Sequence, residues 1–453
     1  MKNILLIGAG RSASSLIRYL AENAVAQGWQ IIVADNNFEL VEEKIQPHPH
    51  LAGLAFDATN ETTSKDVISK QDLVISLLPP FLHIKVAKIC LELSKNLLTA
   101  SYISDEMRLL DADVKKKGLI FLNEIGLDPG IDHLSAMQIL DNLREEGHEI
   151  TTFKSYTGGL VAPESDNNPW NYKFTWNPQN VVLAGQSVAK YLENGSHKYI
   201  PYHQLFSRIE NFSIDGFGEF EGYANRDSLG YQNVYGLENA TTILRGTLRR
   251  KGFCSAWNCF IQLGMTDNQT KISTKNLTNY DFLHSFLPDN QTSYEYLKLA
   301  QHSDEIEKLA WLGLFENKKI TLSPQLFPLE IATPAQILQH ILEDKWTLED
   351  TDKDMIVMQH QIGFREKQKE NSSKTSEKLC TSELVVLGED STHTAMAKTV
   401  GLPLGIAAKL ILNNKISSKG VCLPLTKEIY EPILLELATL GIVFKEKIIT
   451  LSE

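Results

Sequence analysis

The segment NEIGLDPGIDHL, residues 123–134, gathers three carboxylates and a histidine around one Pro-Gly turn. It follows an apolar run, GLIFLN, that is typical of a buried strand. Polar groups in such a place cost on the order of a few kcal/mol unless they are paired or hydrogen-bonded. The carboxylates of this turn therefore need a partner or a function. The structural alternative is that Asp128 caps the helix expected to begin near Ile131.

The other polar residues of this region have their own alternatives. Asp132 and His133 fall in the first turn of the expected helix, where the helix dipole favours an acid, so we expect them to be structural. Glu124 stays open between a site role and a structural role. Lys173, in NYKF, is a carboxylate partner, a desolvated general base, or a surface lysine. Tyr172 and Trp176 are expected in the core.

A second chemical pattern opens the chain, in ILLIGAGRSASSLIRYL. A Gly-x-Gly-x-x-Ala turn directly after a strand and before a helix is typical of dinucleotide binding: it turns tightly, approaches a pyrophosphate and packs helix on strand. The helix N-terminus offers N–H groups to the phosphates. A packing turn without a nucleotide is the alternative. The residues expected to bind the cofactor here are Gly8, Gly10, Arg11, Ser12 and Ala13.

Asp35, at the end of the second expected strand, indicates which cofactor binds. A carboxylate there accepts hydrogen bonds from ribose hydroxyls and repels a 2′-phosphate. The neighbouring residues 36–39 contain no Lys or Arg. We therefore expect NAD, with NADP as the alternative. Asp57, after the third strand, either reaches the adenine end of the cofactor or is a solvated turn residue.

The elements that must position these residues follow from hydrophobic patterning. Six short apolar runs separated by helix-length segments predict a Rossmann-type, doubly wound parallel sheet, hence an α/β fold. The runs are NILLIG, QIIVAD, HLAGLAFDA, DLVISLLP, NLLTASY and LIFLNEIG. After about residue 150, strands rich in aromatics, Gly and Thr predict an antiparallel or mixed sheet. Residues from roughly 270 to 355 predict a helical insert. Residues 366–378 predict a surface loop, and residues 391–415 a helix opened by a Ser/Thr cap.

Composition excludes several classes of protein. A chain of 453 residues should form about three domains. Its net charge of -12 argues against a nucleic-acid partner and an anionic membrane surface. Five scattered cysteines, with no CxxC, favour a reducing cytoplasm and give no zinc signature. The start MKNILLIGAG predicts a strand rather than a signal peptide, and no apolar run has the length of a membrane span. We interpret the chain as cytoplasmic and metal-free.

An ordered set of motifs carries a family resemblance. TASYIS, NEIGLDPGIDHLSAM, GGLVAPESDNNPWNYKFTW, YANRDS and ILRGTLRRKGF occur in this order. Together they resemble the glutamate-forming saccharopine dehydrogenases and reductases of lysine metabolism, over most of the chain. The resemblance implies a homodimer of three-domain subunits: a Rossmann domain (1–129 and 392–453), an α/β substrate-binding and dimerisation domain (130–268 and 356–391), and a helical insert (269–355).

The resemblance also implies roles for single residues. Asp128 would touch saccharopine, and the backbone of Leu127 and Pro129 would lie along the cofactor. The other substrate contacts implied are Ser101, Tyr102, Arg226, Thr247, Leu248 and Arg249. Guanidinium groups suit saccharopine, which has three carboxylates. For Arg226, an ordinary ion pair with the adjacent Asp227 is the alternative.

This chain departs from the family pattern at two positions. Fungal reductases of the family use NADP and carry an arginine after the second strand, where this chain has Asp35. A family serine near the cofactor is Asn177 here, which leaves that contact in doubt.

The reaction implied is the NAD(P)-linked oxidation of the C–N bond of saccharopine, giving L-glutamate and 2-aminoadipate 6-semialdehyde. Asp128 and Tyr102 are the candidates for proton transfer. One rival is an enzyme acting on a polyamine conjugate such as carboxynorspermidine. That substrate calls for acidic walls, and Arg226 and Arg249 argue against it. Another is a regulatory protein that binds nucleotide without turnover, which the glycine turn alone would allow.

Overall fold

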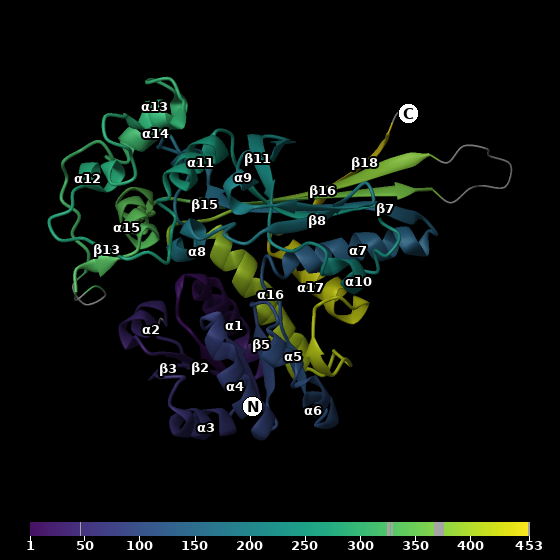
Figure 1. The fold of residues 1–453 in the computed structure, drawn as a ribbon. Coiled ribbons are helices and arrows are strands. Elements are labelled where there is room, and N and C mark those ends of the chain that lie inside the picture. Colours follow the sequence, from purple (N-terminus) through teal and green to yellow (C-terminus); the bar gives the residue numbers. More distant parts are fainter. Residues whose placement is uncertain (46, 324–326, 328, 367–375, 452–453) are drawn as a thin grey trace. The chain divides into compact units, whose positions relative to one another are not determined.

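A computed structural model describes residues 1–45, 47–323, 327, 329–366 and 376–451. The chain folds into two compact units (Figure 1). Unit 1 contains Met1–Glu149, Arg365–Ser376 and Leu384–Lys447, and unit 2 contains Ile150–Phe364, Glu377–Glu383 and Ile448–Glu453. The division into three domains stays a prediction. The predicted loop at 366–378 lies mostly outside the described residues.

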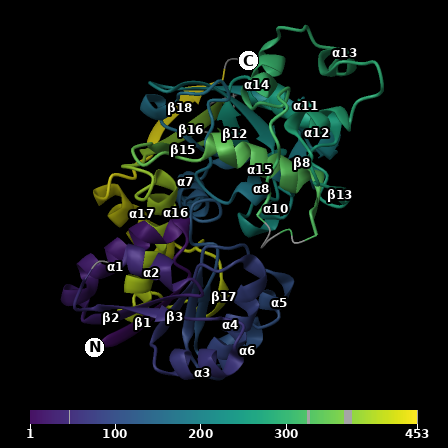
Figure 2. The same cartoon turned by 90° about the vertical axis from the view of Figure 1, so that its left-hand side faces the viewer.

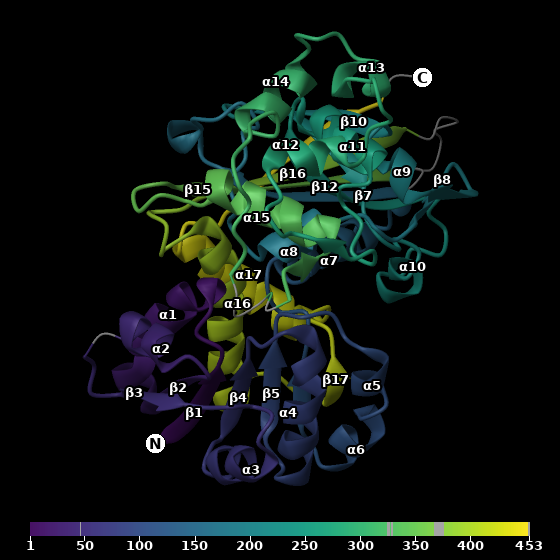
Figure 3. The same cartoon turned by 60° about the vertical axis from the view of Figure 1, so that its left-hand side comes forward.

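Unit 1 is built on a seven-stranded parallel sheet in the order β17-β6-β5-β4-β1-β2-β3. Its strands are β1 (Lys2–Ile7), β2 (Trp29–Asp35), β3 (Leu51–Ala55), β4 (Leu73–Ser76), β5 (Asn96–Thr99), β6 (Ile120–Leu122) and β17 (Gly420–Cys422). All six strands predicted in the first part of the chain are confirmed. Figure 3 shows the yellow β17, from the C-terminal part of the chain, beside the blue strands that it completes.

Helices cover both faces of this sheet, as the doubly wound pattern requires. One face packs on α3 (Glu61–Ser69), α4 (Pro80–Glu92) and α6 (Asp111–Lys116). The other carries α1 (Ser14–Gln27), which follows a short 3-10 turn, η1 (Arg11–Ala13), and α16 (Ala395–Leu412). The remaining helices of unit 1 are α2 (Phe38–Lys44), α5 (Asp105–Arg108), α7 (Ile131–Glu145) and α17 (Lys427–Thr439).

Helix α16 is a core element. Its predicted cap is confirmed, because the Thr394 side chain accepts a hydrogen bond from the Ala397 N–H at 2.9 Å. A Cβ at Gly401 would lie 2.7 Å from the Leu16 nitrogen, and a Cβ at Gly405 would lie 2.4 Å from the Tyr19 ring. Helix α16 therefore packs closely against α1 at two positions where only glycine leaves enough space. By length and composition α16 could cross a membrane, but 72% of it is buried in the protein, as in a core helix of a folded domain.

Unit 2 is built on a mixed sheet whose main order is β10-β11-β12-β7-β15-β16-β18. Figure 2 labels β12, β15, β16 and β18 of this sheet. Strand β12 (Thr242–Arg250) pairs in parallel with β7 (Glu149–Val161) and antiparallel with β11 (Gly218–Ala224), which confirms the predicted mixed sheet. The other strands are β8 (Ala189–Glu193), β9 (Ser196–Ile200), β10 (Ile209–Ile214), β15 (Asp354–Arg365), β16 (Glu377–Leu387) and β18 (Lys445–Thr450).

Between β12 and β15 the regular structure of the described residues is mainly helical, and the helical insert at 269–355 stays a prediction. These residues form α11 (Phe253–Leu263), α12 (Asn279–His284), α13 (Ser293–Leu297), α14 (Asp304–Trp311) and α15 (Pro334–Trp346), with a ribbon of β13 (Ile272–Ser273) and β14 (Ile331–Ala332). The short elements before them are η2 (Pro163–Ser165), α8 (Pro178–Val182), α9 (Tyr202–Leu205) and α10 (Tyr231–Val234). Tyr172 is buried among aromatic rings as expected, whereas Trp176 is only half-buried.

Candidate functional site

The glycine turn after β1 has the geometry of a phosphate cradle. Gly8 has a φ of +108°, and a Cβ there would lie 2.9 Å from the Leu77 carbonyl oxygen, so the position requires glycine. A Cβ at Gly10 would meet nothing within 4 Å, so the space beside this backbone is open. Ala13 is buried where helix meets strand. The turn therefore fits a pyrophosphate at the start of the first helix.

Asp35 is tied to this turn. Its Oδ2 accepts a hydrogen bond from the Ala9 N–H at 2.7 Å, and its Oδ1 accepts one from the Asn37 N–H at 2.9 Å. Each carboxylate oxygen has a second lone pair, which keeps capacity for ribose hydroxyls. The preference for NAD over NADP stays a prediction.

Lys44, in the last turn of α2, also contacts the glycine turn. The sequence did not predict this contact. Its Nζ donates to the Gly10 carbonyl oxygen at 2.5 Å and to Ser14 Oγ at 3.1 Å, and burial lowers its pKa. The only signal was a lysine ending the helix after β2. By contrast, Asp57 is exposed and accepts from the Thr59 N–H at 2.8 Å and the Thr59 hydroxyl at 2.7 Å, as in a solvated turn. Its contact with the adenine stays a prediction.

In the turn after β6, Glu124 and His133 are buried against each other. Glu124 Oε2 lies 2.9 Å from His133 Nε2, and Glu124 Oε1 accepts from the Ile103 N–H at 3.0 Å. Asp132 Oδ1 accepts from the Gly130 N–H at 2.6 Å. These contacts hold the turn in shape, and they support the structural alternative for all three side chains.

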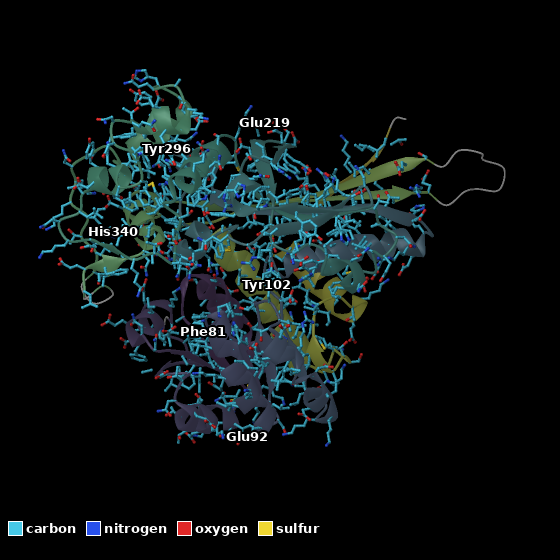
Figure 4. The ribbon with its side chains drawn as sticks, viewed as in Figure 1. Phe81, Glu92, Tyr102, Glu219, Tyr296 and His340 are labelled. Carbon is cyan, nitrogen blue, oxygen red and sulfur yellow. The ribbon has the colours of Figure 1, made fainter. Side chains whose placement is uncertain are left out.

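Asp128 is placed differently. Its carboxylate is only partly buried and accepts a hydrogen bond from the Tyr102 hydroxyl at 3.2 Å. Tyr102 lies just beyond β5 and is 37% exposed (Figure 4). The N-cap residue of α7 is Gly130, which has no side chain to cap the helix, and the capping alternative for Asp128 stays open. The flanking Leu127 and Pro129 carbonyls accept from the Asp132 and Gly126 N–H groups, and their contact with a cofactor stays a prediction.

Ser101 belongs to a polar network that the sequence did not indicate. Its Oγ lies 2.8 Å from His83 Nε2, and His83 Nδ1 lies 2.9 Å from Ser76 Oγ. His83 is a buried side chain of α4, and burial lowers its pKa to about 4. A histidine inside an apolar helix carries no motif of its own.

In unit 2, strand β12 places Arg245, Thr247 and Arg249 on one face because side chains alternate along a strand. Leu248 points to the other face and is fully buried. Arg249 is only 4% exposed, with its guanidinium 5.2 Å from the centre of the Tyr172 ring.

The hydrogen bonds of Arg249 leave its charge uncompensated. Its Nη1 donates to the Leu248 carbonyl oxygen at 3.0 Å, and its Nε has no hydrogen-bond partner. Among the described residues, no carboxylate forms an ion pair with it. Glu221, also buried, lies opposite Arg249 on β11, but its carboxylate accepts from the Gly252 and Cys254 N–H groups. Arg249 is therefore a buried cation that forms no ion pair among the described residues.

The neighbouring candidates differ from Arg249. Arg226 is exposed, and the adjacent Asp227 pairs instead with Lys190 at 3.4 Å. Lys173 is buried and pairs with Asp352 at 2.6 Å, so the surface-lysine alternative is wrong. Asn177 caps α8 by accepting from the Asn180 N–H. Within the described residues, no group of three or more His, Cys, Asp or Glu side chains could hold a metal ion.

A doubly wound parallel sheet with this glycine turn after its first strand defines a dinucleotide-binding protein. Two family models match the chain: the saccharopine dehydrogenase NADP binding domain over residues 4–122, and the saccharopine dehydrogenase C-terminal domain over residues 126–442. The chain belongs to the saccharopine dehydrogenase family, which confirms the resemblance and the NAD(P) class of cofactor.

Relatives match along the whole chain. Saccharopine dehydrogenase [NADP(+), L-glutamate-forming] of Saccharomyces cerevisiae is 34% identical, over 98% of this chain and 99% of its own length. Mitochondrial alpha-aminoadipic semialdehyde synthase of Mus musculus is 35% identical over 98% of this chain, which spans only 47% of that longer protein. The solved structure of apo saccharopine dehydrogenase (L-Glu forming) from S. cerevisiae superposes with a TM-score of 0.87 at 32% identity, covering 99% of this chain and 100% of that one.

Proposed function

We propose that this chain is an NAD(P)-dependent oxidoreductase that cleaves saccharopine oxidatively to L-glutamate and 2-aminoadipate 6-semialdehyde. The saccharopine dehydrogenase of Saccharomyces cerevisiae is similar to this chain over 99% of its own length. The observation that supports an anionic substrate is Arg249, because a buried guanidinium that forms no ion pair and has an Nε without a hydrogen-bond partner favours an anionic ligand. Saccharopine supplies three carboxylates. A polyamine conjugate would instead bring cations to this side chain, which disfavours the polyamine alternative.

Residues of the protein itself carry out the proton transfers of the reaction. A bound nicotinamide would supply the hydride acceptor for the lysine ε-carbon of saccharopine, which is the carbon that becomes the aldehyde. Asp128 accepts the proton that the substrate ammonium must lose first and releases it to solvent, and it later accepts one from the water that adds to the imine carbon. The Tyr102 hydroxyl, bonded to the Asp128 carboxylate at 3.2 Å, orients that carboxylate and relays a proton back to nitrogen as the C–N bond breaks. Both side chains are accessible to solvent, unlike Glu124 and His133.

The proposal includes finer assignments. We assign NAD as the preferred cofactor because Asp35 ends β2. Ser101, Arg226, Thr247 and Leu248 complete the substrate contacts with Arg249. The chain acts as a cytoplasmic homodimer that associates through residues 130–268 and 356–391, with 269–355 as a helical insert.

Nicotinamide absorbance tests the proposal directly. Purified protein is assayed with saccharopine and with carboxynorspermidine, each with NAD and with NADP, and the products are identified by mass. We expect reduction of the cofactor with saccharopine only, together with stoichiometric glutamate. Turnover of carboxynorspermidine alone, or nucleotide binding with no turnover of either substrate, would contradict it.

A further inference from the structure

We propose that His83 is a positioning residue that turns the Ser101 hydroxyl into a hydrogen-bond donor for a ligand carboxylate. The inference rests on the proposed function, in which Ser101 touches saccharopine. It concerns a network of three hydrogen-bonded side chains inside unit 1, the Ser76–His83–Ser101 network. Ser76 ends β4, His83 lies on α4, and Ser101 lies just after β5.

The geometry of the Ser76–His83–Ser101 network is specific. The His83 ring lies between two serine hydroxyls, with Nδ1 2.9 Å from Ser76 Oγ and Nε2 2.8 Å from Ser101 Oγ. Thr99 Oγ1 lies 3.5 Å from Nδ1 and 3.3 Å from Nε2, so the serines are the nearer partners of both nitrogens. Thr99 Oγ1 also accepts from the Ser101 N–H at 3.2 Å, which fixes the backbone beside the hydroxyl.

Hydrogen-bond accounting assigns the tautomer of His83. Burial keeps the imidazole neutral, with one donating and one accepting nitrogen. Ser76 is fully buried, and among the described residues its hydroxyl is bonded only to His83. Because a buried hydroxyl proton without an acceptor costs about 1–3 kcal/mol, Ser76 donates to Nδ1. The buried Thr99 hydroxyl has the same nitrogen as its acceptor at 3.5 Å, so this tautomer leaves neither proton without an acceptor. The proton of the ring is therefore on Nε2, and it is donated to Ser101 Oγ.

The consequence falls on Ser101. Its oxygen already accepts from His83, so its own proton is directed to another acceptor. Ser101 is half-buried, and His83 is the only partner of its hydroxyl within the described residues. A carboxylate only accepts hydrogen bonds, whereas an ammonium group only donates them. The Ser76–His83–Ser101 network thus favours an anionic group at Ser101 and disfavours a cationic one.

Kinetics with matched variants test this role. In His83→Leu, Ser101 loses its donor, and we expect KM for saccharopine to rise about tenfold with kcat and the Kd of the cofactor little changed. In His83→Gln, whose amide can donate to Ser101, KM should return most of the way to the native value. In Ser101→Ala, adding His83→Leu should raise KM no further, because His83 acts through the Ser101 hydroxyl. Additive effects in the double variant, or an unchanged KM in His83→Leu, would overturn the inference.

A spectroscopic measurement keeps the inference separate from the activity. Nitrogen NMR of the imidazole in the native protein should show the proton on Nε2 and no titration of His83 between about pH 5.5 and 8. A proton on Nδ1 would refute the assignment even if His83→Leu fails to fold. If the native protein does not turn over saccharopine while the tautomer is as stated, the proposed function fails and the Ser76–His83–Ser101 network stands.

Discussion

The turn after β6 and strand β12 both bury charged groups, but they treat them in opposite ways. In the turn, Glu124 contacts His133 and a backbone N–H, and Asp132 accepts from Gly130. On β12, Arg249 is as buried as Glu124, yet no carboxylate of the described residues pairs with it. A charge that the fold neutralises holds the fold together. A charge that the fold leaves uncompensated indicates a ligand.

The largest effect should come from removing that cation. Arg249→Met should weaken saccharopine binding by about 2–5 kcal/mol, roughly 30- to several thousand-fold, because a carboxylate of the ligand loses its buried partner. The melting temperature should hold or rise, since an unpaired buried charge is replaced by an apolar side chain. Calorimetric titration and thermal unfolding measure the two quantities.

Lys173→Met is the matched control for Arg249→Met. It also removes a buried cation of unit 2, but one that pairs with Asp352 at 2.6 Å. Leaving that carboxylate alone should destabilise the protein by about 3–5 kcal/mol. If both variants lose stability to the same extent, the contrast between paired and unpaired charges is wrong, and Arg249 is structural.

Asp128→Asn should lower turnover without lowering stability. The amide keeps the size and an acceptor for Tyr102 but cannot take a proton. General acid–base help is worth about 10²–10⁴ in rate, so kcat should fall at least tenfold. The melting temperature should change little because asparagine keeps a side-chain oxygen that can cap a helix as Asp128 can. Near-normal kcat with a melting point several degrees lower would return Asp128 to a structural role.

Glu124→Gln should give the opposite result in the same turn. An amide keeps a bond to the Ile103 N–H but loses the charge facing His133, which should cost about 1–3 kcal/mol of stability. Once the variant is folded, kcat should stay within a few-fold of the native value. Urea unfolding and steady-state rates at one temperature measure both. A loss of kcat at unchanged stability would make Glu124 the proton-transfer residue.

The smallest effect concerns the cofactor. The native protein should favour NAD, and Asp35→Asn with Asn36→Arg should shift kcat/KM toward NADP by about tenfold, because a repulsive charge is removed and a phosphate partner is added. Asparagine keeps one of the two acceptor oxygens that Asp35 now uses, so the Ala9 N–H can keep its hydrogen bond while that of the Asn37 N–H is lost. A native preference of tenfold or more for NADP would show that Lys44 or Arg11 outweighs Asp35.

The sequence predicted the parts of the molecule whose signals are local. The six apolar strands, the glycine turn and the Thr394 cap each depend on a few adjacent residues, and all are confirmed. The family and its class of cofactor are confirmed as well, because five motifs in one order are far more specific than any one of them.

The parts that the sequence did not predict depend on residues that are far apart along the chain. Lys44 reaches Gly10 from a different helix, and His83 joins serines that end two different strands. Lys173 could not be distinguished from a surface lysine, because its partner Asp352 is 179 residues away. Such pairings exist only after the sheets have formed. The roles of Asp128, Tyr102 and the β12 residues stay predictions.

The contacts of α16 and β17 affect how unit 1 folds while the chain is being synthesised. Residues 1–122 supply six strands of the sheet in unit 1, but its seventh strand and the helix that packs through Gly401 and Gly405 on α1 are made more than 270 residues later. Until then, the apolar side of α1 at Leu16 and the edge of β6 have no native cover. The nascent residues 1–122 should therefore expose apolar surface to which chaperones bind, and the sheet of unit 1 should close only after residues 395–422 have been made.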